Sequence, residues 1–124
     1  MNTKDYMKDY YQRNKSYFQL RNKKYRLANP EMGRKHRLQR NFGLTVDEYN
    51  AMFEKQNGCC AICGKHQDTF KKRLAVDHNH STGQIRGLCC SDCNLGLGKF
   101  KDSKELLLNA LTYLKSFESP FQNN

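Results

Sequence analysis

The chain of 124 residues contains no tryptophan and only two prolines, Pro30 and Pro120. It also has no run of about 18 apolar residues, so we expect no membrane-spanning helix. A hydrophobic share of 37% in a chain of this length allows only a modest core, which favours a metal ion as an added cross-link. We see no secretory leader, and we therefore expect cysteines that stay reduced.

Acidic residues are scarce in the first third of the chain. Residues 1–40 hold twelve Lys or Arg against three Asp or Glu, a net charge of +9, whereas residues 41–124 hold ten against nine, a net charge of +1. Aromatic residues alternate with the basic ones: Tyr6, Tyr10, Tyr11, Tyr17, Phe18 and Tyr25. Because Lys and Arg displace counterions and rings stack on bases, this pattern predicts a nucleic-acid partner. A solvated helix or a face for anionic lipid is the alternative.

The cysteines form two Cys-x-x-Cys pairs separated by 26 residues: Cys60 with Cys63, and Cys90 with Cys93. Two such knuckles supply the four thiolates that structural zinc prefers. Cys59 and Cys89 fall outside this spacing, so we interpret them as unliganded side chains. The alternative, two disulfides, is disfavoured in a reducing compartment. We predict one structural zinc ion and an apo protein that folds poorly.

Helices are expected in the basic segment. Apolar residues at a spacing of three to four predict one long helix over residues 4–28, which Asn29 and Pro30 should end. Pro30 then suits the first turn of a second basic helix that runs to about Arg40, with Gly43 as its C-terminal cap.

The segment that contains the cysteines predicts a strand, a turn, a strand and a helix. Before it, Thr45 and Glu48 have the form of a capping box for a short helix. Residues 74–76 read as a strand, residues 81–83 as a turn and residues 85–89 as the returning strand.

Two further helices are expected towards the C-terminus. Asn94 would begin the first, although two glycines weaken it. Asp102 and Glu105 form a second potential capping box, and Ser119-Pro120 should end that helix. Its apolar residues lie on one side: Leu106, Ala110, Leu111, Leu114 and Phe117.

Four polar residues carry the groups that phosphodiester hydrolysis needs, namely Asp77, His78, His80 and Asn94. Carboxylate and amide oxygens suit Mg²⁺ or Mn²⁺, and an imidazole suits the role of base. Adjacent strand residues point to opposite faces, so Asp77 and His78 share a site only if the strand ends or bulges there. Asn79 reads as a spacer that faces away. The alternatives are a polar turn and an additional zinc ligand.

These motifs resemble the phage recombination endonuclease VII family of the His-Asn-His nucleases. The similarity covers residues 42–116 and is carried by Cys-Ala-Ile-Cys-Gly, Val-Asp-His-Asn-His and Gly-Gln-Ile-Arg-Gly-Leu-Cys-Cys-Ser-Asp-Cys-Asn. The resemblance implies a mostly helical α+β protein with a small zinc-stapled ββα-metal (His-Me finger) core, basic N-terminal helices and a C-terminal helix.

The resemblance also implies roles for individual residues. Asp77 and Asn94 would hold one catalytic Mg²⁺ or Mn²⁺, His78 would be the general base and His80 would assist at the phosphate. Glu105 stands where the family can contribute an acid, although helix capping explains it equally well. For Arg86, a phosphate contact and a role beside a local carboxylate are equally supported.

We therefore predict three parts: a basic DNA-binding extension over residues 1–41, a nuclease domain over residues 42–118 and a frayed tail over residues 119–124. The predicted function is that of a metal-dependent DNA endonuclease, on duplex or branched DNA. The alternative is a zinc-dependent DNA-binding module without catalysis, and RNA remains an open substrate class. The resemblance further implies a homodimer and a phage or prophage-encoded protein in the cytoplasm of a bacterial host.

Overall fold

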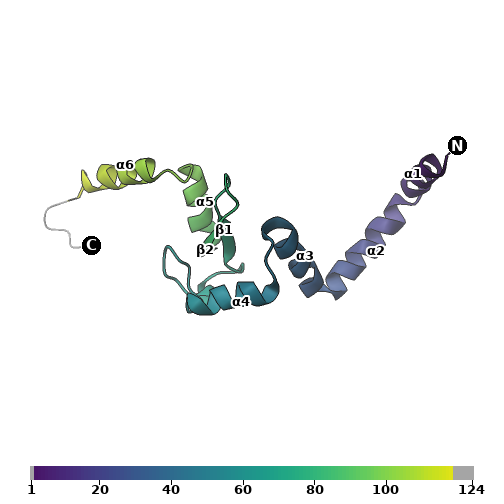
Figure 1. Ribbon diagram of the computed structural model, residues 1–124, viewed down its shortest axis with the longest axis horizontal. Helices are drawn as coiled ribbons and strands as arrows, with labels where there is room; N and C mark the ends of the chain where they lie inside the picture. Colours follow the sequence, from purple (N-terminus) through teal and green to yellow (C-terminus); the bar gives the residue numbers. More distant parts are fainter. Residues whose placement is uncertain (1, 119–124) are drawn as a thin grey trace. The chain divides into compact units, whose positions relative to one another are not determined.

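The computed structural model describes residues 2–118, so the predictions for Ser119-Pro120 and the tail lie outside the described residues. The described chain is mostly helical, with one antiparallel hairpin (Figure 1), which confirms the predicted α+β class. It divides into two compact units, Met1–Tyr49 and Asn50–Asn124. We describe each unit by itself, and the assignment of a function to each part stays a prediction.

The first unit begins with two helices where we predicted one. Helix α1 spans Thr3–Arg13 and helix α2 spans Lys15–Ala28. At Asn14, φ is −107° and ψ is 17°, and the side-chain amide donates a 2.8 Å hydrogen bond to the Tyr10 carbonyl. Because an asparagine side chain competes with the backbone for such carbonyls, it favours a helix end. The single helix predicted over residues 4–28 is therefore wrong at Asn14.

The next helix, α3, follows the predicted signals. It spans Pro30–Phe42, with Pro30 in its first turn and Gly43 as its C-cap. Gly43 has a φ of 65°, a left-handed conformation that glycine adopts at little cost. Both the proline start and the glycine cap are confirmed.

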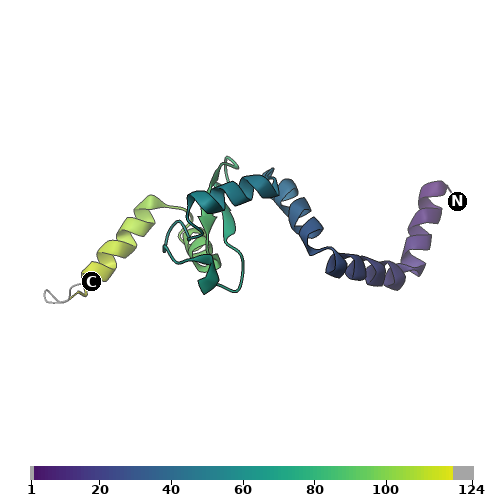
Figure 2. The same cartoon turned by 90° about the horizontal axis from the view of Figure 1, so that it is seen from below.

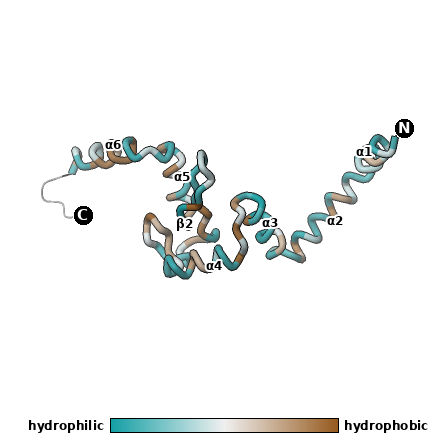
Figure 3. The backbone as a smooth tube through the Cα atoms, viewed as in Figure 1, coloured by the Kyte–Doolittle hydropathy of each residue, from teal (hydrophilic) through white to brown (hydrophobic). Residues whose placement is uncertain are grey.

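The first unit has a thin core. Helices α1 and α2 contain no buried residue, and the unit's buried hydrophobic side chains are Leu38 and Tyr49. The Tyr11 ring stacks on Phe18 across the break at Asn14, with 4.5 Å between centroids. Figure 3 shows the hydrophilic colouring that predominates along α1 and α2. These helices therefore expose most of their charged and tyrosine side chains to solvent.

Helix α4 spans Val46–Lys55 and begins with the predicted capping box. The Thr45 N–H donates to the Glu48 carboxylate at 2.9 Å, and the Glu48 N–H donates to the Thr45 hydroxyl at 3.1 Å. This reciprocal pair satisfies two backbone donors at the start of the helix. The predicted capping box is confirmed.

The core of the second unit is a two-stranded hairpin. Strand β1, Ala75–His78, pairs antiparallel with β2, Ile85–Cys89. Leu74, Val76 and Leu88 are buried, and Leu88 has no exposed surface. Helix α5, Ser91–Lys99, lies beside the hairpin in both views (Figures 1 and 2) and contacts β1.

Both C-terminal helices begin at positions other than those predicted. Helix α5 begins at Ser91, three residues before Asn94, because the Cys90 sulfur accepts a 3.4 Å hydrogen bond from the Cys93 N–H and caps the helix. Helix α6 spans Lys104–Lys115. Its N-cap is Ser103, whose hydroxyl accepts from the Leu106 N–H at 3.1 Å. The capping box predicted at Asp102 and Glu105 is wrong, because a hydroxyl one residue later takes that role.

Gln56, just after α4, joins that helix to the hairpin. Its amide nitrogen donates to the Cys59 carbonyl at 2.9 Å and to the Leu88 carbonyl at 2.8 Å. Its amide oxygen accepts from the Leu88 N–H at 2.9 Å. One side chain therefore satisfies both backbone groups of a fully buried strand residue and ties them to the first cysteine knuckle.

We expect Gln56→Leu to lower the free energy of unfolding by about 1 to 3 kcal/mol, because the buried Leu88 N–H loses its partner, whereas the Leu88 carbonyl keeps the Ala61 N–H. Urea unfolding of the zinc-loaded protein, followed by far-UV circular dichroism, measures the change. Lys55→Leu is the control, because Lys55 is the exposed neighbour in the last turn of α4. Equal unfolding midpoints for the two variants would contradict the assigned role of Gln56.

Candidate functional site

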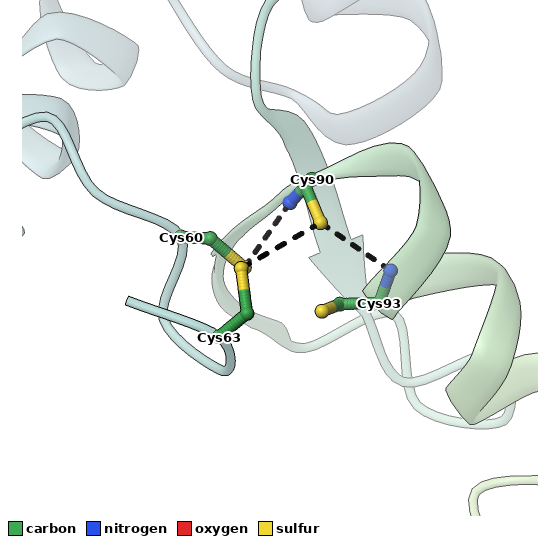
Figure 4. Close-up of side chains that lie close together, drawn as sticks. All are labelled: Cys60, Cys63, Cys90 and Cys93. Carbon is green, nitrogen blue, oxygen red and sulfur yellow. Dashed lines mark hydrogen bonds between the residues drawn. The ribbon is translucent and has the colours of Figure 1, made fainter. Parts of the chain in front are cut away.

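Four cysteine sulfurs converge between the loop after α4 and the start of α5 (Figure 4). The ligand atoms of Cys60, Cys63, Cys90 and Cys93 all lie within 4.8 Å of one another. All six cysteines are free thiols, so the disulfide alternative is not what the structure has. Four clustered sulfurs match the donor set of a structural zinc site. The predicted pairing by Cys-x-x-Cys spacing is confirmed at the level of this cluster.

Backbone N–H groups point at these sulfurs. The Cys60 sulfur accepts from the Cys90 N–H at 3.3 Å and from the Ile62 N–H at 3.5 Å. The Cys90 sulfur accepts from the Cys93 N–H. Such donors stabilise thiolates and fix the direction in which each sulfur points. The two knuckles are therefore shaped by hydrogen bonds between segments that lie 30 residues apart in sequence.

The thiols differ in acidity. Burial of Cys60 opposes ionisation, but the backbone donors outweigh it and lower the pKa of Cys60 to about 6. Burial raises the pKa of Cys93 to about 12, and hydrogen bonds within the cluster add to the rise. A bound zinc ion would ionise such a thiol. Burial, with the charge of Cys60, also raises the pKa of Cys89 to about 12, which suits its interpretation as an unliganded side chain.

The hairpin has a bulge between Asp77 and His78. Asp77 pairs with Gly87, but His78 pairs with Ile85, so the register shifts between Asp77 and His78. Arg86 is the extra residue of the longer strand. A bulge re-aims the side chains around it, which was the condition that we set for Asp77 and His78 to serve one site.

The structure brings the two histidines of the turn together. The rings of His78 and His80 lie 4.5 Å apart at an interplanar angle of 58°. His78 is half-buried and His80 is exposed. Between them, the Asn79 side chain accepts hydrogen bonds from the Ser81 and Thr82 N–H groups at 2.8 and 3.1 Å. Asn79 therefore builds the turn, a more specific role than the spacer that we predicted.

Asp77 contacts a residue whose role the sequence left open. The Arg86 Nε donates to Asp77 Oδ2 at 2.8 Å, and Nη2 donates to Oδ1 at 2.9 Å. Nη2 also donates to the Asp102 carboxylate at 3.1 Å. These hydrogen bonds, that to Asp77 first, raise the pKa of Arg86. Of the two roles considered for Arg86, the structure shows the one beside a carboxylate.

Asn94 lies on the helix that packs on β1. It is half-buried in α5, and Leu97, one turn later on the same side of that helix, lines a cavity of about 290 Å³ together with Asp77. Glu105 is exposed in the first turn of α6. In sequence it lies between Lys104 and Leu107, which both line this cavity. A carboxylate and an amide oxygen are donor types that suit Mg²⁺ or Mn²⁺, and each Asp77 oxygen keeps a lone pair after the Arg86 contact.

Sequence reasoning missed two contributors to this region, Asp102 and Gln56. We predicted that Asp102 caps a helix. It lies beside Arg86 because of the turn between α5 and α6, for which the sequence contains no recognisable short motif. Gln56 carries no motif, and only the folded chain brings it to Leu88. His36 and His66 are exposed, as expected.

The fold and the cysteine cluster define a small ββα protein with a site for structural zinc. The family model described as recombination endonuclease VII matches residues 35–116. The chain therefore belongs to the recombination endonuclease VII family, which confirms the resemblance drawn from its motifs.

Two curated relatives come from mycobacteriophages. The Gene 59 protein of Mycobacterium phage D29 is 45% identical over 75 residues, which cover 60% of this chain and 45% of the relative. The Gene 59 protein of Mycobacterium phage L5 is 40% identical over 93 residues, which cover 74% of this chain and 56% of the relative. The chain thus spans about half the length of the curated relatives it matches. Among the described residues, no helix is both long and apolar enough to cross a membrane.

We expect Cys93→Ser to lose the bound zinc and most of the ordered structure. Zinc in such sites contributes roughly 10 to 16 kcal/mol, which exceeds the usual stability of a small domain. Zinc content by atomic absorption and folding by circular dichroism give the answer. Cys59→Ser is the matched control and should keep one zinc ion per chain. One zinc ion in a folded Cys93→Ser protein would show that the four sulfurs are not the ligand set.

Proposed function

We propose that this protein is a metal-dependent DNA endonuclease in which His78 is the general base. Family membership supports a nuclease that acts on DNA. The observation that supports the proposal is the bulge between Asp77 and His78, which interrupts the regular alternation of side chains at the end of β1, where these two residues follow one another. Two neighbouring groups of this kind can serve one reacting phosphate.

In this proposal, each residue has one task. His78 takes a proton from the water that attacks phosphorus, and its position beside the His80 ring limits the directions in which it can point. His80, which is exposed, donates a hydrogen bond to a phosphate oxygen. A divalent ion, when bound, stabilises the charge that develops on the phosphate and the leaving oxygen. Asp77 and Asn94 supply oxygen ligands for that ion, and Glu105 is a candidate further acid.

The basic helices α1, α2 and α3 would hold the DNA backbone. Tyr6, Tyr11 and Tyr17 are each more than half exposed, so their rings are available to stack or to pack on sugar. The Arg21 guanidinium lies 5.0 Å from the centre of the Phe18 ring, which keeps a positive charge next to this aromatic group. Family membership favours branched DNA as the substrate.

The predicted homodimer belongs to this proposal as well. Helix α6 contains no buried residue, and Leu108, Leu114 and Phe117 are each more than 60% exposed. A second copy of the chain could cover these side chains. Light scattering of the zinc-loaded protein separates a monomer from a dimer.

We expect the wild-type protein to nick supercoiled plasmid with Mg²⁺ or Mn²⁺, and His78→Ala to lower the rate by about 10²- to 10⁴-fold, because general-base catalysis contributes that much. His66→Ala is the control, because His66 is an exposed histidine outside the proposed site. Zinc content should be equal in all three proteins.

Two outcomes would contradict this assignment. Equal nicking by wild type and His78→Ala would remove His78 from the reaction. DNA binding without cleavage by the wild type, with any divalent ion, would instead assign a zinc-dependent DNA-binding module. Parallel reactions on a four-way junction, a linear duplex and a single strand compare the substrate classes.

We expect the triple variant Lys23→Gln, Lys24→Gln and Arg26→Gln in α2 to reduce the slope of log affinity against log salt by up to about three, since each neutralised phosphate contributes roughly 0.9. Fluorescence anisotropy with a labelled duplex over a range of salt measures this slope. The control replaces three exposed lysines of the second unit, Lys55, Lys71 and Lys115, with Gln. An equal loss of slope in the control would contradict a special role for the basic helices.

A further inference from the structure

Arg86 occupies an unusual place in the hairpin. Across the register shift, Gly87 pairs with Asp77 and Ile85 pairs with His78, which leaves Arg86 as the extra residue of β2. In a regular ladder Arg86 would be the partner of His78. The bulge instead turns its side chain towards Asp77, the residue before His78. The bulge and the contact between Arg86 and Asp77 are thus one structural feature.

The guanidinium of Arg86 holds both oxygens of Asp77. The distances are 2.8 Å from Nε to Oδ2 and 2.9 Å from Nη2 to Oδ1, the geometry of a two-point fork. The Asp77 side chain is 9% exposed and that of Arg86 is 32% exposed. A fork of two parallel hydrogen bonds fixes the plane of the carboxylate, which a single bond does not. Each oxygen keeps a second lone pair for another ligand.

Asp102 in turn holds the guanidinium. Its carboxylate accepts from Nη2 at 3.1 Å, so three N–H donors of Arg86 are committed to two acids. Asp102 has a φ of 53° and follows Lys101, whose φ is 56°. Left-handed conformations at residues other than glycine persist where the surrounding structure imposes them, and they collect at functional sites. Hydrogen bonds from the Lys101 and Asp102 N–H groups back to α5 impose the conformation here.

We propose that Arg86 is the positioning residue for Asp77. Its fork sets the plane of the Asp77 carboxylate so that a divalent ion finds a ligand oxygen already oriented, and Asp102 keeps the fork in place. The inference rests on the proposed function, because it assigns Asp77 to the catalytic ion. Beyond that function, the inference assigns to Arg86 a role that acts on the ion through Asp77. It also connects the site to the turn between α5 and α6.

The direction in which the affinity for a divalent ion changes when Arg86 is replaced separates a positioning role from simple masking of charge. If Arg86 only masked the charge of Asp77, its removal would strengthen the attraction of Asp77 for a cation. If Arg86 positions Asp77, its removal leaves a carboxylate free to rotate and weakens ion binding. Groups that orient a metal ligand contribute about 10- to 100-fold to metal affinity or activity.

The test uses the zinc-loaded full chain and Mn²⁺ as the probe, with binding followed by electron paramagnetic resonance of free Mn²⁺. Wild type should bind Mn²⁺ at a site that Asp77→Asn abolishes. Arg86→Gln should bind Mn²⁺ about 10- to 100-fold more weakly. The Mn²⁺ affinity of Arg86→Lys should lie between those of wild type and Arg86→Gln, because an ammonium keeps the charge but cannot form the fork. Lys115→Gln, which removes an exposed positive charge outside this cavity, should bind as wild type does.

Asp102→Asn provides a second variant with less risk to folding. Asparagine tolerates the left-handed conformation, so the backbone at residue 102 is kept while the charge is removed. We expect weaker Mn²⁺ binding than in wild type, by a smaller factor than in Arg86→Gln. In nicking assays, Arg86→Gln should lower the rate at saturating DNA more than it changes the affinity for DNA. Zinc content and circular dichroism identify variants that fold.

Three results would overturn the inference. Unchanged or tighter Mn²⁺ binding by folded Arg86→Gln or Arg86→Lys, with the Asp77-dependent site present in wild type, would remove the positioning role and leave the proposed function intact. A loss of DNA affinity with unchanged Mn²⁺ binding would make Arg86 a phosphate contact. No Asp77-dependent Mn²⁺ site in wild type would overturn both this role and the assignment of Asp77 to the catalytic ion.

Discussion

The convergence of four cysteine sulfurs is the constraint on which the second unit depends. Cys60 and Cys63 come from the loop after α4, whereas Cys90 and Cys93 come from the end of the hairpin and the start of α5. A hydrogen bond from the Cys90 N–H to the Cys60 sulfur joins the two knuckles, and a hydrogen bond from Cys93 to Cys90 starts α5. The largest fully buried side chains among the described residues are Leu74 and Leu88, so apolar burial is small, and a metal cross-link at the four sulfurs would compensate for it.

The hairpin links this cross-link to the polar residues. Leu88 and Cys89 at one end of β2 lie in the core, and Arg86 at the bulge lies among the acids. Asp77 is the one buried charged residue in the described part of the chain, and its burial is compensated by the Arg86 fork. A buried carboxylate without such a partner would be strongly unfavourable. The bulge therefore serves folding and the proposed chemistry together: it accommodates a charge in the core and orients it.

The two units differ in composition. The first unit carries most of the net positive charge of the chain and little buried surface, whereas the second carries the sulfur cluster and the hairpin. A segment with a thin core suits the proposed contact with a charged partner, and ordering its exposed side chains on binding would cost conformational entropy. In contrast, Asp77 and His78 lie in the hairpin, and Asn94 lies in α5.

The sequence alone determined the local features: the proline and glycine at the ends of α3, the capping box at Thr45, the strand at residues 85–89, the zinc-ligand spacing and the family. Each depends on neighbouring residues or on a short motif, so a linear reading suffices. The break at Asn14 and the caps of α5 and α6 rest on local hydrogen bonds over three or four residues, for which several neighbouring polar groups compete. Tertiary structure decided the partner of Arg86 and the role of Gln56, because these contacts form only when segments distant in sequence come together, as Gln56 with Leu88 and Arg86 with Asp102 do.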